Sequence, residues 1–292
     1  MNIGWIGTGI MGAAIAEHLQ AAGHALHLCT RTRAKAEQLL AGGAAWCPDP
    51  AEVARATEVV FTIVGYPAEV EAVYFGAHGI FSAEKSTATL LVDLTSSPPA
   101  LARRISAAAT ARGLAALDAP VTGGDVGARE GTLSIMVGGN ADAFERALPL
   151  LRLMGRNIER VGGPGAGQQA KVVNQILIAG TMVGLCEALL VAARAGLDQT
   201  QLIRLLGAGA AGSWALQRLG PRLARGDQAP GFMVDHFLKD LEIALHEAEA
   251  LGLKLPGVEL ARTLYEKARA LGHGRSGTQA LILALEALNP QR

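Results

Sequence analysis

The sequence has few of the residues that mark several large classes of protein. Its 292 residues include three cysteines and seven histidines, and charged residues make up only 18%. Because 26 basic residues balance 26 acidic ones, there is no excess of positive charge of the kind that binds nucleic acid. Cys29, Cys47 and Cys186 are far apart in the chain and have apolar neighbours, so we expect buried thiols in a cytoplasmic protein. The histidines show no metal-ligand spacing, and we predict no metal.

Long uninterrupted hydrophobic runs are also scarce. The most apolar stretch, residues 172–190, contains Asn174, Gln175 and Glu187, and the run at 281–288 is too short to cross a membrane. The chain opens directly into an apolar strand pattern rather than a signal peptide. Half of the residues are nevertheless apolar. We therefore expect a globular protein without a membrane partner.

Apolar runs and turn residues divide the chain into two parts. Before residue 163, short apolar runs alternate with helical patterns, which predicts a mostly parallel α/β sheet with helices on both faces. The predicted strands are 3–6, 25–29, 59–64, 90–94, 114–118, 133–137 and 157–161, and the predicted helices are 10–22, 33–41, 50–56, 68–74, 97–111 and 141–153. After the glycine-rich break at 161–167 the periodicity is helical, over 168–195, 199–208, 214–223, 235–251, 256–271 and 276–287. We predict a doubly wound α/β domain over residues 1–163, a long joining helix and an all-α domain over residues 164–292.

The amino-terminal glycines predict a dinucleotide site. A short strand runs into Gly7-Thr-Gly9-Ile10-Met11-Gly12, and a helical pattern and a second strand follow. In such a βαβ unit the glycines allow a tight turn, close approach to a pyrophosphate and close helix packing. The amino terminus of the helix also favours phosphate charge.

The segment after the second strand predicts which dinucleotide binds. An acidic residue there would hold the ribose 2′-hydroxyl of NAD, but the chain reads Thr30-Arg31-Thr32. Arginine suits a 2′-phosphate because its guanidinium binds phosphate bidentately. We predict NADP(H), with weaker use of NAD and with Arg31 as the main determinant. The alternative is an ordinary basic helix start, with Arg33 and Lys35 beside it.

The stretch 118–132, which follows a short apolar strand, has no clear strand or helix pattern. Its Thr122-Gly123-Gly124 step exposes backbone N–H groups that can hold a carboxylate or phosphate. It also lies just past the end of a strand, where α/β proteins bind their ligands. The alternative interpretation is a glycine-rich surface loop.

The joining helix contains a candidate catalytic lysine. Lys171, Asn174 and Gln175 share one helix face, and apolar residues flank them. Burial disfavours the charged form of an amine, so a lysine held there suits general acid catalysis near neutral pH. The alternative is a surface lysine that extends into solvent.

Further candidates lie after two strands and on a later helix. Gly65 and Tyr66 can brace the adenosine half of a dinucleotide, and the Thr95 hydroxyl can reach its ribose or nicotinamide. Ser96 and Ser97 are alternatively helix caps. Because Lys239 and Asp240 are adjacent, they cannot both face the same way on a helix, and they can equally form an exposed pair.

In their order along nearly the whole chain, these motifs resemble those of the β-hydroxyacid dehydrogenase family, the 3-hydroxyisobutyrate dehydrogenase-like group. The resemblance rests on the glycine motif at 7–12, the Asp118-to-Gly124 stretch, Lys171-Val-Val-Asn-Gln175 and Lys239-Asp-Leu241. It implies an amino-terminal Rossmann domain, a carboxy-terminal helical domain and a small carboxylate substrate that meets nicotinamide.

The resemblance also implies roles for single residues. Lys171 would be the catalytic acid/base, and Thr122, Gly123 and Gly124 would hold the substrate carboxylate. Asn174 and Gln175 would orient Lys171 and the substrate, with support from Asp240. The predicted cofactor contacts are Gly7, Gly9, Ile10, Met11, Gly12, Thr30, Arg31, Thr32, Val64, Gly65, Tyr66, Thr95 and Lys239.

The predicted reaction is hydride transfer between NADP(H) and a small hydroxy acid or aldehyde acid, such as succinic semialdehyde, glyoxylate or tartronate semialdehyde. Thr122 and Gln175 depart from the family's usual Ser and Asn, which leaves the substrate open. Alternatives are a 3-hydroxyisobutyrate dehydrogenase acting oxidatively, an imine reductase, and a non-catalytic dinucleotide-binding module. Since the helix over residues 176–190 is apolar nearly all round, we also expect a homodimer or homotetramer.

Overall fold

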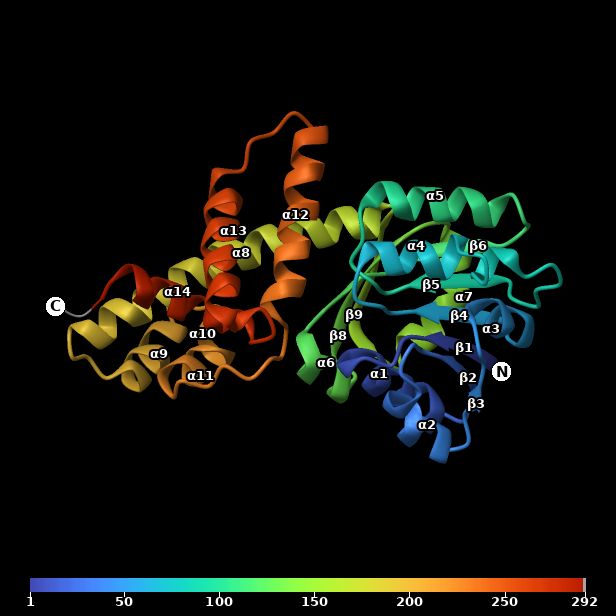
Figure 1. The fold of residues 1–292 in the computed structure, drawn as a ribbon, viewed down its shortest axis with the longest axis horizontal. Coiled ribbons are helices and arrows are strands. Elements are labelled where there is room, and N and C mark those ends of the chain that lie inside the picture. The colour runs from blue at the N-terminus through green and yellow to red at the C-terminus, as the bar shows by residue number, and fades with distance from the viewer. Residues whose placement is uncertain (291–292) are drawn as a thin grey trace. The chain divides into compact units, whose positions relative to one another are not determined.

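The computed structural model describes residues 1–290 (Figure 1). Two compact units make up the chain, Met1–Lys171 and a second unit from Val172 onward. The long helix α8 (Ala166–Arg194) begins in the first unit and continues into the second. The boundary predicted near residue 163 lies just before this helix, whereas the compact units divide within it.

The first unit is built on one sheet of nine strands. Its strand order is β3-β2-β1-β4-β5-β6-β8-β7, with β9 beside β8. The strands are β1 (Asn2–Ile6), β2 (Ala25–Cys29), β3 (Ala45–Trp46), β4 (Val59–Thr62), β5 (Leu90–Asp93), β6 (Ala115–Asp118), β7 (Val121–Thr122), β8 (Leu133–Gly138) and β9 (Gly155–Gly162). β1 to β6 are parallel, and β8 runs antiparallel to β6 and β7. Because the chain continues from β1 to β2 on one side and returns at β4 on the other, the strand order reverses at β1, where such sheets bind ligands.

Two apolar cores cover the two faces of this sheet. Trp5 and Phe61 point to one core, where their rings stack with centroids 5.6 Å apart, and their neighbours Ile6 and Val60 point to the other. This alternation follows from the two-residue period of a strand. The flanking helices and 3₁₀ turns are α1 (Ile10–Ala21), η1 (Arg33–Ala36), α2 (Glu37–Ala41), α3 (Pro50–Ala56), α4 (Pro67–Phe75), η2 (Ile80–Ser82), α5 (Pro99–Thr110), α6 (Gly124–Glu130) and α7 (Ala141–Leu151).

The second unit is helical around one apolar core. Phe237 and Tyr265 meet edge to face there, with ring centroids 4.9 Å apart, and the Tyr265 hydroxyl donates to the carbonyl of Thr278. After α8 come α9 (Gln199–Gly207), α10 (Trp214–Arg218), α11 (Gly220–Ala224), α12 (Val234–Ala250), α13 (Pro256–Ala268), the π-helical turn η3 (Arg269–His273), η4 (Thr278–Ala280) and α14 (Leu281–Leu288). The predicted fold class, a Rossmann sheet followed by an all-α domain, is confirmed.

The structure corrects the sequence analysis in the stretch 118–132, for which we predicted neither strand nor helix. Val121 and Thr122 form β7 by pairing with Ile135 and Ser134, and α6 follows at once. A two-residue strand is too short to show a period, and glycine disfavours a helix in propensity rules. Pairing with β8 decides the strand, and α6 lies against α1, where His18 Nε2 is 2.9 Å from the carbonyl oxygen of Ala128.

The apolar character of α8 also exceeds our expectation. By length and composition alone this helix could cross a membrane, although only one such helix occurs within residues 1–290. This is weak evidence, because core helices of soluble proteins pass the same test. The absence of a membrane partner stays a prediction.

Candidate active site

The glycine turn after β1 has the shape that a dinucleotide needs. Gly7 has φ of +104°, and a Cβ there would lie 2.0 Å from the carbonyl oxygen of Ile63. A Cβ on Gly12 would lie 2.3 Å from the carbonyl oxygen of Gly7, whereas a Cβ on Gly9 would meet no atom within 4 Å. The buried indole of Trp5 donates to the Gly7 carbonyl at 2.8 Å and fixes the turn. The first and last glycines are thus required by packing, and the middle one borders open space.

The amino terminus of α1 lies at that open space. Gly9 caps the helix without a side-chain hydrogen bond, and no acidic residue occupies the first turn. The Thr8 hydroxyl is buried without a hydrogen-bond partner, and the Ile10 side chain is 56% exposed. Uncapped amides and an unsatisfied hydroxyl fit a pyrophosphate. These residues therefore fit the pyrophosphate of a dinucleotide.

Arg31 forms an ion pair that the sequence analysis did not foresee. Its Nη1 atom lies 2.7 Å from Oε1 of Glu69, and Oε2 of Glu69 accepts from the Gly65 amide at 2.8 Å. Arg33 instead lies over the Trp46 ring, 5.3 Å from its centroid. Arg31 and Glu69 come from segments far apart in sequence, so only the sheet order reveals the pair.

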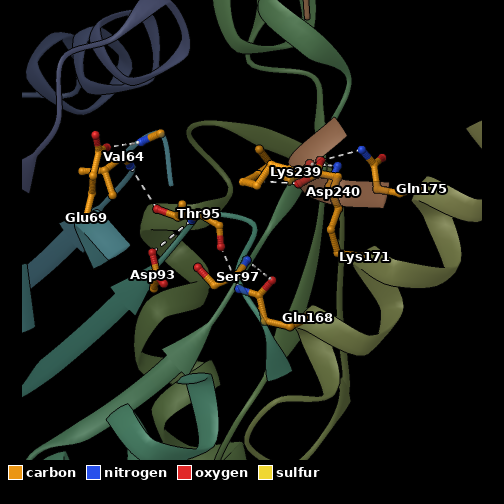
Figure 2. Close-up of polar contacts among 12 residues, drawn as sticks. Val64, Glu69, Asp93, Thr95, Ser97, Gln168, Lys171, Gln175, Lys239 and Asp240 are labelled. Atoms are coloured by element: carbon orange, nitrogen blue, oxygen red, sulfur yellow. Dashed lines mark hydrogen bonds and ion pairs between the residues drawn. The ribbon is translucent and has the colours of Figure 1, made fainter. Parts of the chain in front are cut away.

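Thr95 forms hydrogen bonds with residues that follow β4, end β5 and begin α8 (Figure 2). Its hydroxyl accepts from the Val64 amide at 3.0 Å, and its own amide donates to Oδ1 of Asp93 at 3.0 Å. The Gln168 side chain donates to the Thr95 carbonyl and accepts from the Ser97 amide. The N-cap residue of α5 is Pro98, and the buried Ser97 hydroxyl has no hydrogen-bond partner, so Ser97 does not cap this helix. Contact between Thr95 and a cofactor stays a prediction, and Gln168 is a positioning residue that the sequence analysis missed.

Asp118, the last residue of β6, caps the start of α8. Its Oδ1 accepts from the Gly165 amide at 2.8 Å, and its Oδ2 accepts from the Gln168 amide at 2.9 Å. The carboxyl is 5% exposed. Burial raises the pKa of Asp118 above its ordinary value, although the amide contacts act in the opposite direction. Asp118, the first residue of the stretch 118–132, thus fixes the start of the helix that carries Lys171.

Lys171 lies beside the predicted carboxylate-binding turn. Its side chain is buried, and Nζ donates to the Val121 carbonyl at 3.0 Å. The turn follows directly, with φ of +129° at Gly123 and +65° at Gly124, a region that favours glycine. The alternatives of a solvent-extended lysine and a featureless surface loop are therefore wrong. The structure brings an amine and a glycine turn together from positions about fifty residues apart.

The residues predicted on the second unit form a buried polar cluster (Figure 2). The Gln175 amide donates to Oδ2 of Asp240 at 2.6 Å, and Nζ of Lys239 lies 3.0 Å from Oδ1 of the same carboxylate. Asp240 is 3% exposed, which excludes the exposed pair. The expectation that adjacent Lys239 and Asp240 must diverge is wrong, because the long lysine side chain reaches back. The side-chain amide oxygen of Asn174 is buried and has no hydrogen-bond partner.

Within residues 1–290 no group of three or more His, Cys, Asp or Glu side chains could hold a metal ion. The absence of a metal stays a prediction. All three cysteines are free and buried.

Two family descriptions match nearly the whole chain. The NAD-binding domain of 6-phosphogluconate dehydrogenase matches residues 2–163, and the NAD-binding domain of NADP-dependent 3-hydroxyisobutyrate dehydrogenase matches residues 165–285. The 2-hydroxy-3-oxopropionate reductase of Escherichia coli K12 is 41% identical over 288 residues, which cover 99% of this chain and 98% of the relative.

Solved structures agree with these matches. A 3-hydroxyisobutyrate dehydrogenase from Salmonella typhimurium has 30% identity and a TM-score of 0.87, and the match covers 97% of this chain and 99% of that one. Psf3 in complex with NADP+ and 2-OPP has 27% identity and a TM-score of 0.90 over the same shares. An imine reductase from Streptomyces aurantiacus, at 20% identity and a TM-score of 0.66, shares the fold alone. The chain therefore belongs to the β-hydroxyacid dehydrogenase family and is an oxidoreductase that uses a nicotinamide dinucleotide.

Proposed function

We propose that this protein is an NADP(H)-dependent reductase of small aldehyde acids, with tartronate semialdehyde, glyoxylate and succinic semialdehyde as candidate substrates. The observation that carries this proposal is the buried Lys171 amine beside the Thr122–Gly124 turn. Tartronate semialdehyde is 2-hydroxy-3-oxopropionate, the compound named for the E. coli relative.

Each part of this site has a separate task. The amides of Gly123 and Gly124 bind the substrate carboxylate, because glycine has no side chain of its own to shield its amide. Lys171 donates a proton to the carbonyl oxygen as the alkoxide forms, and its positive charge stabilises that oxyanion. The bound dinucleotide supplies the hydride. Asp118 and Gln168 hold the first turn of α8, and so position Lys171.

The preference for NADP(H) is supported by the residue that follows β2. Arg31 occupies the place where an acidic residue would bind the 2′-hydroxyl of NAD. Its side chain is 85% exposed and can reach a ligand phosphate. The family description matching residues 165–285 names an NADP-dependent enzyme, and Psf3 was solved with NADP+.

The substrate class can be tested by following NADPH consumption with glyoxylate, succinic semialdehyde, tartronate semialdehyde and methylmalonate semialdehyde, with NADH in parallel. We expect turnover of at least one of these compounds, and the ranking among them gives the length of the pocket. Tight NADPH binding without turnover of any of the four would contradict the proposal.

A second candidate is a 3-hydroxyisobutyrate dehydrogenase that works oxidatively. It is favoured by the match to the Salmonella structure and by the family description of residues 165–285. Oxidation of 3-hydroxyisobutyrate by NADP+ or NAD+, faster than reduction of any aldehyde acid, would select this function.

We also propose that a second copy of the chain covers the outer face of α8. Val173, Leu177 and Val191 on this helix are 58%, 67% and 66% exposed, and the exposed Gly180 and Gly184 lie between them. Apart from the exposed Glu187 at its edge this face is apolar, and such a face is unfavourable in water unless it is covered. Light scattering should give a mass of two or four chains, and Leu177→Glu should shift it towards the monomer. A monomeric wild type, or one that partitions into vesicles, would contradict this proposal.

A further inference from the structure

An ion pair joins the two segments that flank the glycine turn. Arg31 follows β2, and Glu69 lies in the first turn of α4, which follows β4. Because β2 and β4 both pair with β1, this pair links the ends of the strands on either side of the one that carries the turn. A ligand at the turn that reaches Arg31 therefore also meets the Glu69 carboxylate.

The two partners are held to different degrees. The second carboxylate oxygen of Glu69 accepts from the Gly65 amide at 2.8 Å, and the side chain is only 22% exposed. The amino terminus of α4 further stabilises this negative charge. The Arg31 side chain, by contrast, is 85% exposed. Glu69 thus keeps its position, and Arg31 is the partner that can turn to a ligand.

The geometry points to Glu69 as a determinant of cofactor preference, since its carboxylate competes with the 2′-phosphate of NADP(H) for Arg31. This inference rests on the proposed assignment of Arg31 to that phosphate. A guanidinium binds phosphate through two parallel N–H groups, and the Nη1 that Glu69 occupies belongs to that fork. NAD(H) has a hydroxyl at the same place and gains nothing from releasing the pair.

Competition from Glu69 for Arg31 lowers the preference for NADPH over NADH without abolishing it. Exposed ion pairs are weak, and their measured range corresponds to a factor of about 1.4 to 5 in an equilibrium constant. A charge-assisted contact from Arg31 to phosphate is stronger, about ten- to a hundredfold. Glu69 therefore moves the protein towards joint use of NADPH and NADH, while NADPH stays preferred.

The test is a titration of dissociation constants for NADPH and NADH by nucleotide fluorescence, without any substrate. In Glu69→Gln the amide oxygen still accepts from Gly65, but the charge that holds Arg31 is gone. The ratio of the NADH constant to the NADPH constant should rise about 1.4- to 5-fold. The matched control is Glu71→Gln on the same helix, where Glu71 pairs with Arg104 instead, and the ratio should not change.

The same titration separates this inference from the proposed function. Arg31→Ala should lower the ratio about tenfold or more, and an unchanged ratio would remove Arg31 from cofactor selection. If Arg31→Ala acts as expected and Glu69→Gln does not, the inference alone is wrong. In the double variant the gain should disappear, whereas a gain that persists would mean that Glu69 acts without Arg31. If Glu69→Gln is thermally unstable, Glu69→Asp replaces it, because the shorter side chain retreats from Arg31 and should raise the ratio as well.

Discussion

The two units differ in where they bury polar side chains. In the first unit such residues gather at strand ends, with Thr8 after β1, Asp93 and Thr95 at β5 and Asp118 at β6. In the second unit the buried polar side chains lie within helices, as a cluster of Gln175 and Asp240 between α8 and α12 and as Thr278 and Gln279 in η4. Burial of a polar group costs free energy unless the group is paired. These buried polar side chains therefore have a role other than packing, such as positioning or binding. The first unit buries polar side chains along one edge of its sheet, whereas the second unit buries them within helices.

We expect the largest effect on activity from Lys171, which lies where the buried polar residues of the first unit meet α8. Lys171→Ala should lower kcat by about 10²- to 10⁴-fold, the usual contribution of a general acid, while NADPH still binds. Steady-state kinetics together with a nucleotide titration would measure both. Lys85→Ala, at an exposed lysine of the same unit, is the control and should change neither. Turnover close to that of the wild type would remove Lys171 from the mechanism. The buried polar residues of the first unit would then have no demonstrated catalytic role.

The polar cluster of the second unit should have its main effect on stability. Asp240→Asn leaves the ammonium of Lys239 without this carboxylate in a largely buried place, and the loss of one partner of a buried pair costs about 3 kcal/mol. Denaturant unfolding should show this loss. Glu266→Gln changes an exposed i,i+4 pair of the same unit and should cost less than about 0.5 kcal/mol. Equal effects of the two variants would mean that burial in this cluster has no energetic significance.

Local patterns predicted the parts of the site that depend on neighbouring residues. The glycine turn is a contiguous motif, and Lys171 with Gln175 follows from helix periodicity. Both are properties of a short segment, so one sequence suffices to place them on a turn and on a helix face.

Contacts between distant segments were not accessible in this way. Gln168 reaches Ser97 over 71 positions, and Glu69 meets Arg31 only because their strands flank β1. β7 exists through its pairing with β8, and Lys239 turns back to Asp240 because the lysine side chain is long. In each case the missing information was the three-dimensional neighbour rather than the residue type.

The smallest effect concerns the cap that links β6 to α8. Asp118→Asn keeps the shape of the side chain but replaces one carboxylate oxygen with an NH₂ group, which cannot accept a hydrogen bond. The amide of either Gly165 or Gln168 therefore loses its acceptor. We expect a loss of about 1–2 kcal/mol in unfolding free energy at neutral pH, and a lower kcat because Lys171 follows this turn. Asp49→Asn is the control, because Asp49 caps α3 from a half-buried position and asparagine caps equally well there.

The pH dependence of this difference tests whether burial or hydrogen bonding dominates at Asp118. Burial raises the pKa of this carboxyl above 3.8 in the folded protein, while the unfolded chain keeps the ordinary value. The folded protein thus binds this proton more readily, so the stability linked to it is present below the ordinary pKa and is lost as pH rises through the raised one. The advantage of the wild type over Asp118→Asn should therefore be larger near pH 4 than near pH 7, by denaturant unfolding at both. An advantage that shrinks in acid would mean that the amides of Gly165 and Gln168 outweigh desolvation, and that the sheet edge stabilises charge more strongly than its burial implies.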